Sequence, residues 1–94
     1  MVVKVAAVMA MPSSSLWAQT ITLGDKPRLS IGRAPDNDVV LDAPGISRFQ
    51  AEVERVGQRY RLRDLRSYNG TFVNAERIQG DVWLKPDDAI RIGP

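Results

Sequence analysis

The sequence of 94 residues contains no cysteine and no histidine, and these two absences exclude several kinds of chemistry. Without cysteine the chain has no disulfide, no thiolate metal ligand and no redox centre. Without histidine it lacks the commonest metal ligand and the usual general base at neutral pH. Neither a Ser-His-Asp triad nor a Cys-His pair is therefore possible within it. We expect a protein that is not an enzyme and that uses no metal and no cofactor.

Long apolar runs are also lacking, since none reaches the roughly 20 residues that span a bilayer. Residues 1–18 loosely resemble a secretory signal, because Lys4 precedes an apolar run and Ala18 is a small residue. A single lysine is a weak charged start for such a signal. We therefore interpret residues 2–11 as a first strand, and we expect a cytoplasmic protein without membrane insertion.

The charges nearly balance, with 13 basic and 11 acidic residues and a formal net charge of +2. Ten of the basic residues are arginine, whose planar guanidinium suits bidentate contact with phosphate or carboxylate. A chain of this length makes one domain with one modest core. We find no repeat and no linker, so we treat residues 1–94 as a single domain.

Strand signals recur about every 8–12 residues, which predicts an all-β sandwich or barrel. The alternation is cleanest at Ala51 and Val53, which we expect to face the core, and at Ile90 and Ile92, which flank an outward-facing Arg91. The predicted strands are residues 2–11, 19–23, 28–31, 38–41, 50–55, 59–64, 71–74, 77–79, 81–84 and 89–92.

Two short blocks on predicted loops suit the binding of a phosphate group. Gly32-Arg33 ends a predicted strand, and a guanidinium there would meet a phosphate with two parallel N–H donors. Ser47-Arg48 lies in a loop after Gly45, where a serine hydroxyl and loop N–H groups can donate to an anion. Read singly, Arg33 is equally a solvated surface residue and Ser47 an ordinary turn residue.

The block Ser67-Tyr68-Asn69-Gly70-Thr71 is the most specific of the motifs. Asn69-Gly70 predicts a tight turn, with a hairpin as the simplest form. The Asn69 amide offers both a donor and an acceptor, so it is suited to bracket the main chain of a peptide. The block also fits the glycosylation acceptor pattern, which arises often by chance.

Together with Phe72-Val73-Asn74 and Ile92-Gly93, the order and spacing of these blocks resemble the forkhead-associated (FHA) family over residues 28–93. The resemblance implies an antiparallel β-sandwich of about eleven strands whose loops at one end bind phosphothreonine peptides. It implies that the peptide contacts come from Arg33, Ser47, Arg48, Ser67, Tyr68 and Asn69. It further implies that the scaffold of the site consists of Gly32, Gln50, Gly70, Thr71 and Asn74.

The chain departs from the family pattern in three ways. Gln50 stands where the family usually has a histidine that braces the binding loop, and Tyr68 replaces a common Ser or Thr. The family also has a further strand after Ile92-Gly93 that pairs with the first strand, and it is missing here. We therefore expect ten to eleven strands without the last one, with the first strand as an unprotected edge that favours self-association.

The sequence thus predicts a phosphothreonine-dependent binding module of a Ser/Thr-kinase signalling system, within a larger protein. Its expected partner is a phosphothreonine-containing kinase substrate. A phosphate-independent interaction domain of the same fold is one alternative. A small nucleic-acid-binding β domain is another, because five arginines lie between Arg55 and Arg66. The small net charge argues against nucleic acid, and Glu52 and Glu54 offer these arginines cross-strand partners.

Overall fold

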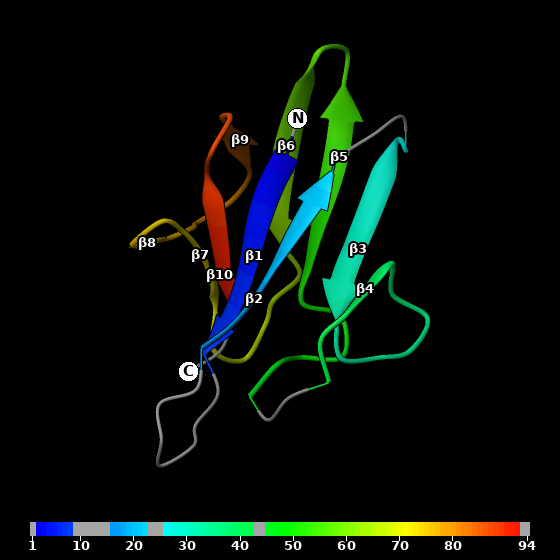
Figure 1. Ribbon diagram of the computed structural model, residues 1–94, viewed down its shortest axis with the longest axis vertical. Coiled ribbons are helices and arrows are strands. Elements are labelled where there is room, and N and C mark those ends of the chain that lie inside the picture. The colour runs from blue at the N-terminus through cyan, green and yellow to red at the C-terminus, as the bar shows by residue number, and fades with distance from the viewer. Residues whose placement is uncertain (1, 9–15, 23–25, 43–44, 93–94) are drawn as a thin grey trace.

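Over the residues that the structure describes, the protein is an all-β sandwich of two five-stranded sheets, and the sequence predicts such a sandwich (Figure 1). The computed structural model describes residues 2–8, 16–22, 26–42 and 45–92. The first sheet has the order β2-β1-β10-β7-β8, formed by Leu16–Thr22, Val2–Val8, Ala89–Ile92, Thr71–Val73 and Glu76–Arg77. The second sheet has the order β4-β3-β5-β6-β9, formed by Val39–Val40, Arg28–Gly32, Ala51–Val56, Arg59–Asp64 and Val82–Leu84.

The predicted strand ranges agree closely with the observed ones. The ranges 59–64 and 89–92 are reproduced without change, and the others after residue 26 differ by one or two residues at an end. The first predicted strand, 2–11, is observed as Val2–Val8, and residues 9–11 lie outside the described residues. The second begins at Leu16 instead of Gln19. Hydrophobic patterns fix the existence of a strand better than its ends.

The expectation that the first strand forms an exposed edge is wrong. Strand β1 pairs with β2 on one side, antiparallel, and with β10 on the other, parallel. The partner on the second side is β10, whose Ile90 lies opposite Val5. Within the described ranges the edges of this sheet are β2 and β8, so β1 offers no free edge for the self-association that we predicted.

The sheets are also less uniformly antiparallel than the sequence predicts. Among the described strands two pairs are parallel, β1 with β10 and β3 with β4. In the second of these, Ile31 lies opposite Val39. The connection from β3 to β4 must therefore cross from the end of one strand to the start of its neighbour. This crossing carries Arg33 into a loop at the end of the sheet.

The core lies between the two sheets and consists of inward-facing residues of their strands together with the loop residues Leu41, Ile46 and Ile78. Ala51 and Val53 on β5 are buried, as predicted, and so are Ile90 and Ile92 on β10, while Arg91 is exposed. The remaining core residues are Ile31, Val39, Leu41, Ile46, Leu62, Ile78 and Leu84. The alternation is that of sheets with one buried and one solvated face.

The chain crosses from the second sheet to the first between β6 and β7. Strand β6 pairs with β5 and β9, whereas β7 pairs with β10 and β8. The predicted hairpin at Asn69-Gly70 is therefore wrong, because the strands on its two sides do not pair. The turn itself is present, and Gly70 has a φ of 90°. Within the described residues we find no helix of the length and apolarity that a bilayer crossing requires.

Candidate functional site

Three loops meet at one end of the sandwich, the lower end in Figure 1. They join β3 to β4, β4 to β5 and β6 to β7. The first two are tied by their main chains, because the N–H of Arg33 donates to the carbonyl of Ser47 at 3.0 Å and the N–H of Ala34 donates to that of Arg48 at 3.1 Å. Gly32 permits this approach, since a Cβ there would lie 2.2 Å from the carbonyl oxygen of Arg48.

The side chain of Arg33 is held in place at its Nε and exposed to solvent. Its Nε–H donates to the carbonyl of Ile46 at 3.1 Å. No described residue accepts a hydrogen bond from its two terminal nitrogens. The guanidinium is thereby fixed at the loop junction with its outer donors available to a ligand.

Ser47 connects the second loop to the third. Its Oγ accepts the main-chain N–H of Tyr68 at 2.9 Å, and its own N–H donates to Oε1 of Gln50 at 3.0 Å. Because the oxygen already accepts a hydrogen bond, the hydroxyl hydrogen remains to be donated. Ser47 is half-buried, so this donor lies at the rim of the loops.

Asn69 lies in the third loop and also reaches the second. Its Nδ2 donates to the carbonyl of Gly45 at 2.8 Å. No described residue donates to its Oδ1, which leaves this acceptor available. The neighbouring Tyr68 is 89% exposed. The predicted ligands Arg33, Ser47 and Asn69 thus gather at one end, and the exposed Arg48 belongs to the same loop as Ser47.

Gln50 braces the loops from below, which answers the question raised by its replacement of a histidine. The side chain is fully buried. Its Nε2 donates to the carbonyl of Gly70 at 2.9 Å and to Oγ1 of Thr71 at 3.0 Å, while its Oε1 accepts the N–H of Ser47. One amide therefore satisfies main-chain groups of two different loops.

Asp64 is a structural residue of the site that the sequence reasoning missed. One carboxylate oxygen accepts from the hydroxyls of Ser67 at 2.5 Å and Thr71 at 2.7 Å, and the other accepts the N–H of Ser67 at 3.2 Å. Ser67 is buried and turned toward this carboxylate, so its hydroxyl acts in the scaffold instead of facing a ligand as we expected. The signal that could have found Asp64 is an Asp followed three residues later by Ser, a local turn pattern.

Asn37 is a second residue missed by the sequence reasoning. It is buried in the first loop, and its Nδ2 donates to the carbonyls of Ala34 and Arg48, each at 2.8 Å. Its contact with the Arg48 carbonyl holds the first two loops together. Only the turn-like Pro35-Asp36-Asn37 run gave any sign of it.

Two predicted scaffold residues differ in their relation to the loops. Gly70 has a φ of 90°, a backbone conformation that favours glycine, and a Cβ there would also displace the flexible side chain of Arg77. Asn74 lies instead at the other end of β7, where its Oδ1 accepts the N–H of Ala89 at 3.1 Å. It joins the β7–β8 turn to β10 and has no hydrogen bond to the described residues of the three loops.

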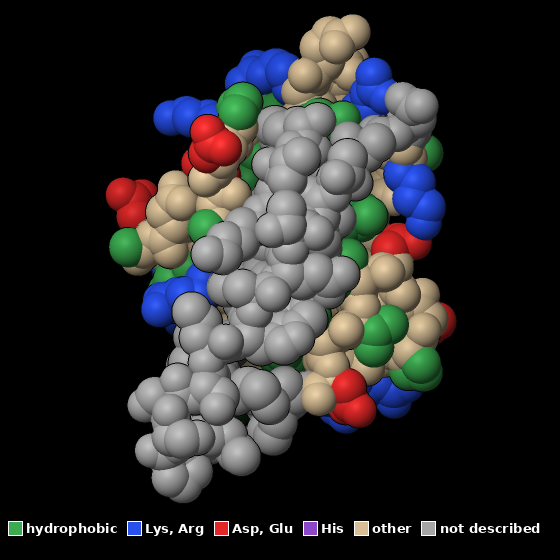
Figure 2. All heavy atoms as spheres, in the orientation of Figure 1, with side chains coloured by type: hydrophobic (Ala, Val, Ile, Leu, Met, Phe, Trp, Pro, Cys, Tyr) green, Lys and Arg blue, Asp and Glu red, His purple; other side chains and the backbone are tan. Residues whose placement is uncertain are grey.

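The arginines of β6 are mostly paired with carboxylates. Arg61 forms an ion pair with Glu54, and Arg63 donates to both oxygens of Asp81 at 3.0 and 3.1 Å. The hydrogen bond from Arg61 lowers the pKa of Glu54, and that from Arg63 lowers the pKa of Asp81. Figure 2 likewise shows basic and acidic side chains interspersed at the margins of one face. Paired charges of this kind make a poor nucleic-acid surface.

The part of the chain that the structure describes contains no cluster of three or more acidic side chains arranged to hold a metal ion. The loop groups described above are donors and acceptors without an assembled acid, base or nucleophile. What they can do chemically is bind an anion together with an adjoining main chain.

Comparison with known proteins identifies the family. Residues 29–93 match the family model of the FHA domain. The chain is 48% identical over 62 residues to the transcriptional regulatory protein EmbR of Mycobacterium tuberculosis, which covers 66% of this chain and 16% of EmbR. The chain therefore belongs to the FHA domain family, and it spans about a sixth of the length of this curated relative.

Solved structures of FHA domains are similar over most of the chain, and two of them carry information about binding. One is M. tuberculosis EmbR in complex with a low-affinity phosphopeptide, with a TM-score of 0.70 and 37% identity, covering 93% of this chain and 22% of that one. The other is the FhaA FHA domain complexed with the intracellular domain of Rv3910, with a TM-score of 0.71 and 32% identity, covering 92% of this chain and 88% of that one.

Proposed function

We propose that this domain binds phosphothreonine-containing peptides through the loops that follow β3, β4 and β6, as the sensing part of a larger protein in a Ser/Thr-kinase signalling system. The observation that carries the proposal is the convergence of Arg33, Ser47 and Asn69. Each is fixed by hydrogen bonds to another part of the loops, and each retains a group that can reach a ligand.

The roles follow from the groups that remain available. A phosphothreonine carries a charge of about −1.5 to −2 at pH 7. The terminal nitrogens of Arg33 pair with two of its oxygens, the hydroxyl of Ser47 donates to an oxygen, and the exposed Arg48 adds positive charge. The Oδ1 of Asn69 accepts a main-chain N–H of the peptide beside the phosphothreonine, with Tyr68 alongside. Because Gln50 and Asp64 hold these loops from below, little ordering remains to be done on binding.

The activity is binding and not catalysis, since the loops carry donors and acceptors but no nucleophile activated by a base. The partner is a protein phosphorylated by a Ser/Thr kinase, which needs ATP, and we therefore place the domain in the cytoplasm. The phosphopeptide complex of EmbR supports this proposal. So does the complex of the FhaA domain with the intracellular domain of another protein.

Calorimetry tests the proposal. A phosphothreonine peptide library is screened, and the best ligand is compared with its unphosphorylated twin. We expect micromolar affinity for the phosphorylated form, about −8 kcal/mol. Replacing Arg33 with alanine removes a charge-assisted contact worth about 1.5–3 kcal/mol, or roughly 10- to 100-fold in affinity. Arg28→Ala, which removes an exposed arginine from β3 outside the loops, serves as the matched control.

Equal binding of the phosphorylated and plain peptides would contradict phosphate dependence and favour the phosphate-independent interaction domain. Circular dichroism confirms that both variants remain folded. A generic oligonucleotide is titrated in parallel to test the remaining alternative, a nucleic-acid-binding domain.

A further inference from the structure

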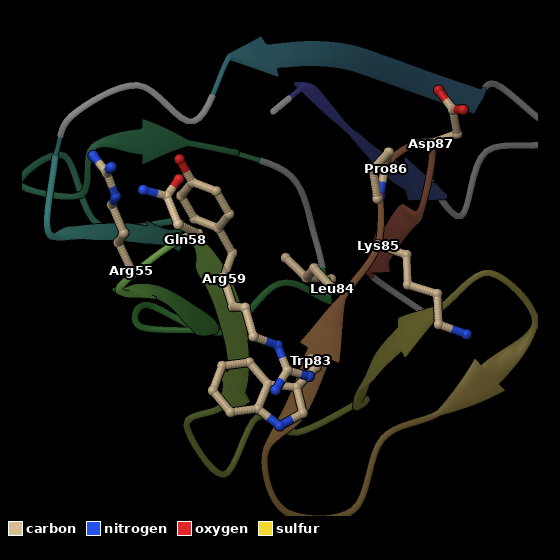
Figure 3. Close-up of a pocket in the computed structure, with 9 residues that line it drawn as sticks. Arg55, Gln58, Arg59, Trp83, Leu84, Lys85, Pro86 and Asp87 are labelled. Atoms are coloured by element: carbon tan, nitrogen blue, oxygen red, sulfur yellow. The ribbon is translucent and has the colours of Figure 1, made fainter.

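A second surface lies at the end of the sandwich opposite the recognition loops. It surrounds Trp83 on β9, a residue that is 37% exposed. Beside it is an open hollow of about 570 Å³, lined by Arg55, Gln58, Arg59, Tyr60, Trp83, Leu84, Lys85, Pro86 and Asp87 (Figure 3). A second hollow of about 560 Å³ lies next to it, and Trp83 and Lys85 line both. An exposed tryptophan between two hollows has no role in the function proposed above.

Arg59 differs from the other outward-facing arginines of its strand. Arg61 and Arg63 are paired with Glu54 and Asp81, whereas no described carboxylate lies within ion-pair distance of Arg59. Instead its guanidinium carbon lies 3.9 Å from the centre of the Trp83 ring (Figure 3). Arg61 also lies over this ring, at 5.7 Å, but it is paired with a carboxylate as well. Among the described residues, Arg59 differs in having the ring without a carboxylate.

This arrangement leaves the donors of Arg59 available. In a cation–π contact the guanidinium lies over the ring, and its N–H groups project from its edges and not into the ring. The contact thereby restrains the guanidinium without using its hydrogen-bonding capacity, so less rotamer entropy is lost when an acceptor binds. A restrained planar fork of this kind matches the two oxygens of a carboxylate.

The charge around the hollow has the same sign as Arg59. Lys85 also lines it, and a single carboxylate among the lining residues, that of Asp87, lies beyond Pro86 on the side away from Arg59 (Figure 3). Tyr60, Trp83 and Pro86 supply apolar surface. Tryptophan and arginine are the residues most enriched at the energetic centres of protein interfaces.

We propose that this surface docks an acidic segment of a partner protein, with a carboxylate of that segment bound by Arg59 on Trp83 and an apolar residue seated in the hollow. The complementary charge selects the segment, and the aromatic ring anchors it.

The surface is separate from the recognition loops. Arg59 begins β6 and Asp64 ends it, a separation of about 17 Å at the rise of an extended strand. A partner can therefore occupy both surfaces at once, which would raise its overall affinity through linkage. The proposal does not depend on phosphothreonine binding, because no residue of this surface belongs to the loops around Ser47.

Nuclear magnetic resonance on the isotopically labelled domain tests the proposal without any phosphopeptide. The probe is a short synthetic peptide of repeated Glu-Asp-Leu triplets, blocked at both ends. We expect saturable shifts of the Trp83 indole N–H and the Arg59 Nε–H signals, with the amides of Ser47 and Asn69 unchanged. Arg59→Gln should weaken binding about tenfold, and Arg59→Lys should also weaken it, because lysine keeps the charge but loses the fork.

Arg28→Gln is the matched control, since it removes an exposed arginine elsewhere on the same sheet, and it should bind as the unmodified domain does. The proposal is overturned if the acidic peptide gives no saturable shift, or if Arg28→Gln weakens binding as much as Arg59→Gln. It is also overturned if a Lys-Arg-Leu peptide binds equally well, or if oligothymidylate binds these residues more tightly than the acidic peptide does.

Discussion

Replacing Gln50 with alanine should both destabilise the domain and weaken peptide binding. The substitution deletes a fully buried amide that makes three hydrogen bonds. It leaves the N–H of Ser47 and the carbonyl of Gly70 without these partners, and it opens a space beneath the loops. Thr71 is affected less, because its hydroxyl still donates to Asp64.

The magnitude follows from the groups left unpaired. Each buried polar group that loses its partner costs about 1–3 kcal/mol. Ser47 is only half-buried, so water can replace part of what its N–H loses. We therefore expect a loss of about 2–4 kcal/mol in the free energy of unfolding, which is a large share of the 5–15 kcal/mol typical of a domain. Affinity for the phosphopeptide should fall as well, since the loop carrying Ser47 loses a restraint.

Urea denaturation measures the loss in the free energy of unfolding, and calorimetry measures the loss of affinity for the phosphopeptide. Gln79→Ala is the matched control, because Gln79 is exposed and surface changes of this kind stay within about 0.5 kcal/mol. The bracing role of Gln50 is refuted if Gln50→Ala behaves like this control in both measurements.

Three further predictions concern the ligand and acid stability. Phosphopeptide affinity should weaken as the pH falls from about 7 to about 5, because the phosphate gains a proton near pH 6. The chain has no histidine whose own protonation would mask that step. If calorimetry shows a constant affinity across this range, recognition of the phosphate dianion is contradicted. By resemblance to the FHA family, phosphothreonine should bind better than phosphoserine by about 0.8 kcal/mol for the buried methyl group, and equal binding of matched peptides would refute this specificity. Three carboxylates have pKa values below their ordinary 3.8–4.5 because basic side chains donate hydrogen bonds to them: Lys26 to Asp38, Arg61 to Glu54 and Arg63 to Asp81. Their contribution to the stability of the fold is therefore present above that range and is lost as the pH falls through the lowered pKa values. Urea midpoints that do not change with pH below 4.5 would refute this contribution.

The sequence predicted those parts of the fold that depend on local alternation. Strands β5 and β10 were predicted with their buried residues, because Ala51 and Val53 are separated by a glutamate and Ile90 and Ile92 flank Arg91. Their partners were harder to predict. The parallel pairing of β1 with β10, and the crossing of the chain between sheets at Asn69-Gly70, depend on contacts between distant segments that no local pattern encodes.

The residues of the candidate site also differ in how far the sequence could predict them. Arg33, Ser47 and Asn69 were predicted from the resemblance of their motifs to the FHA family, and the structure brings them to one end of the sandwich. Asp64 was missed because a carboxylate at the end of an arginine-rich strand resembles an ordinary surface charge, and its hydrogen bond with Thr71 forms only when the chain has crossed to the other sheet. Trp83 was missed because a single tryptophan in a short strand resembles a core residue, whereas its ring lies against Arg59 at the surface.

The most direct test of the account is to map a phosphothreonine peptide onto the labelled domain by nuclear magnetic resonance. We predict that the amides of Arg33, Ser47 and Arg48 and the side-chain NH₂ of Asn69 shift together and saturate, and that the unphosphorylated twin leaves all of them unchanged. The account is contradicted if the phosphorylated peptide shifts none of these signals, or if both peptides shift them equally.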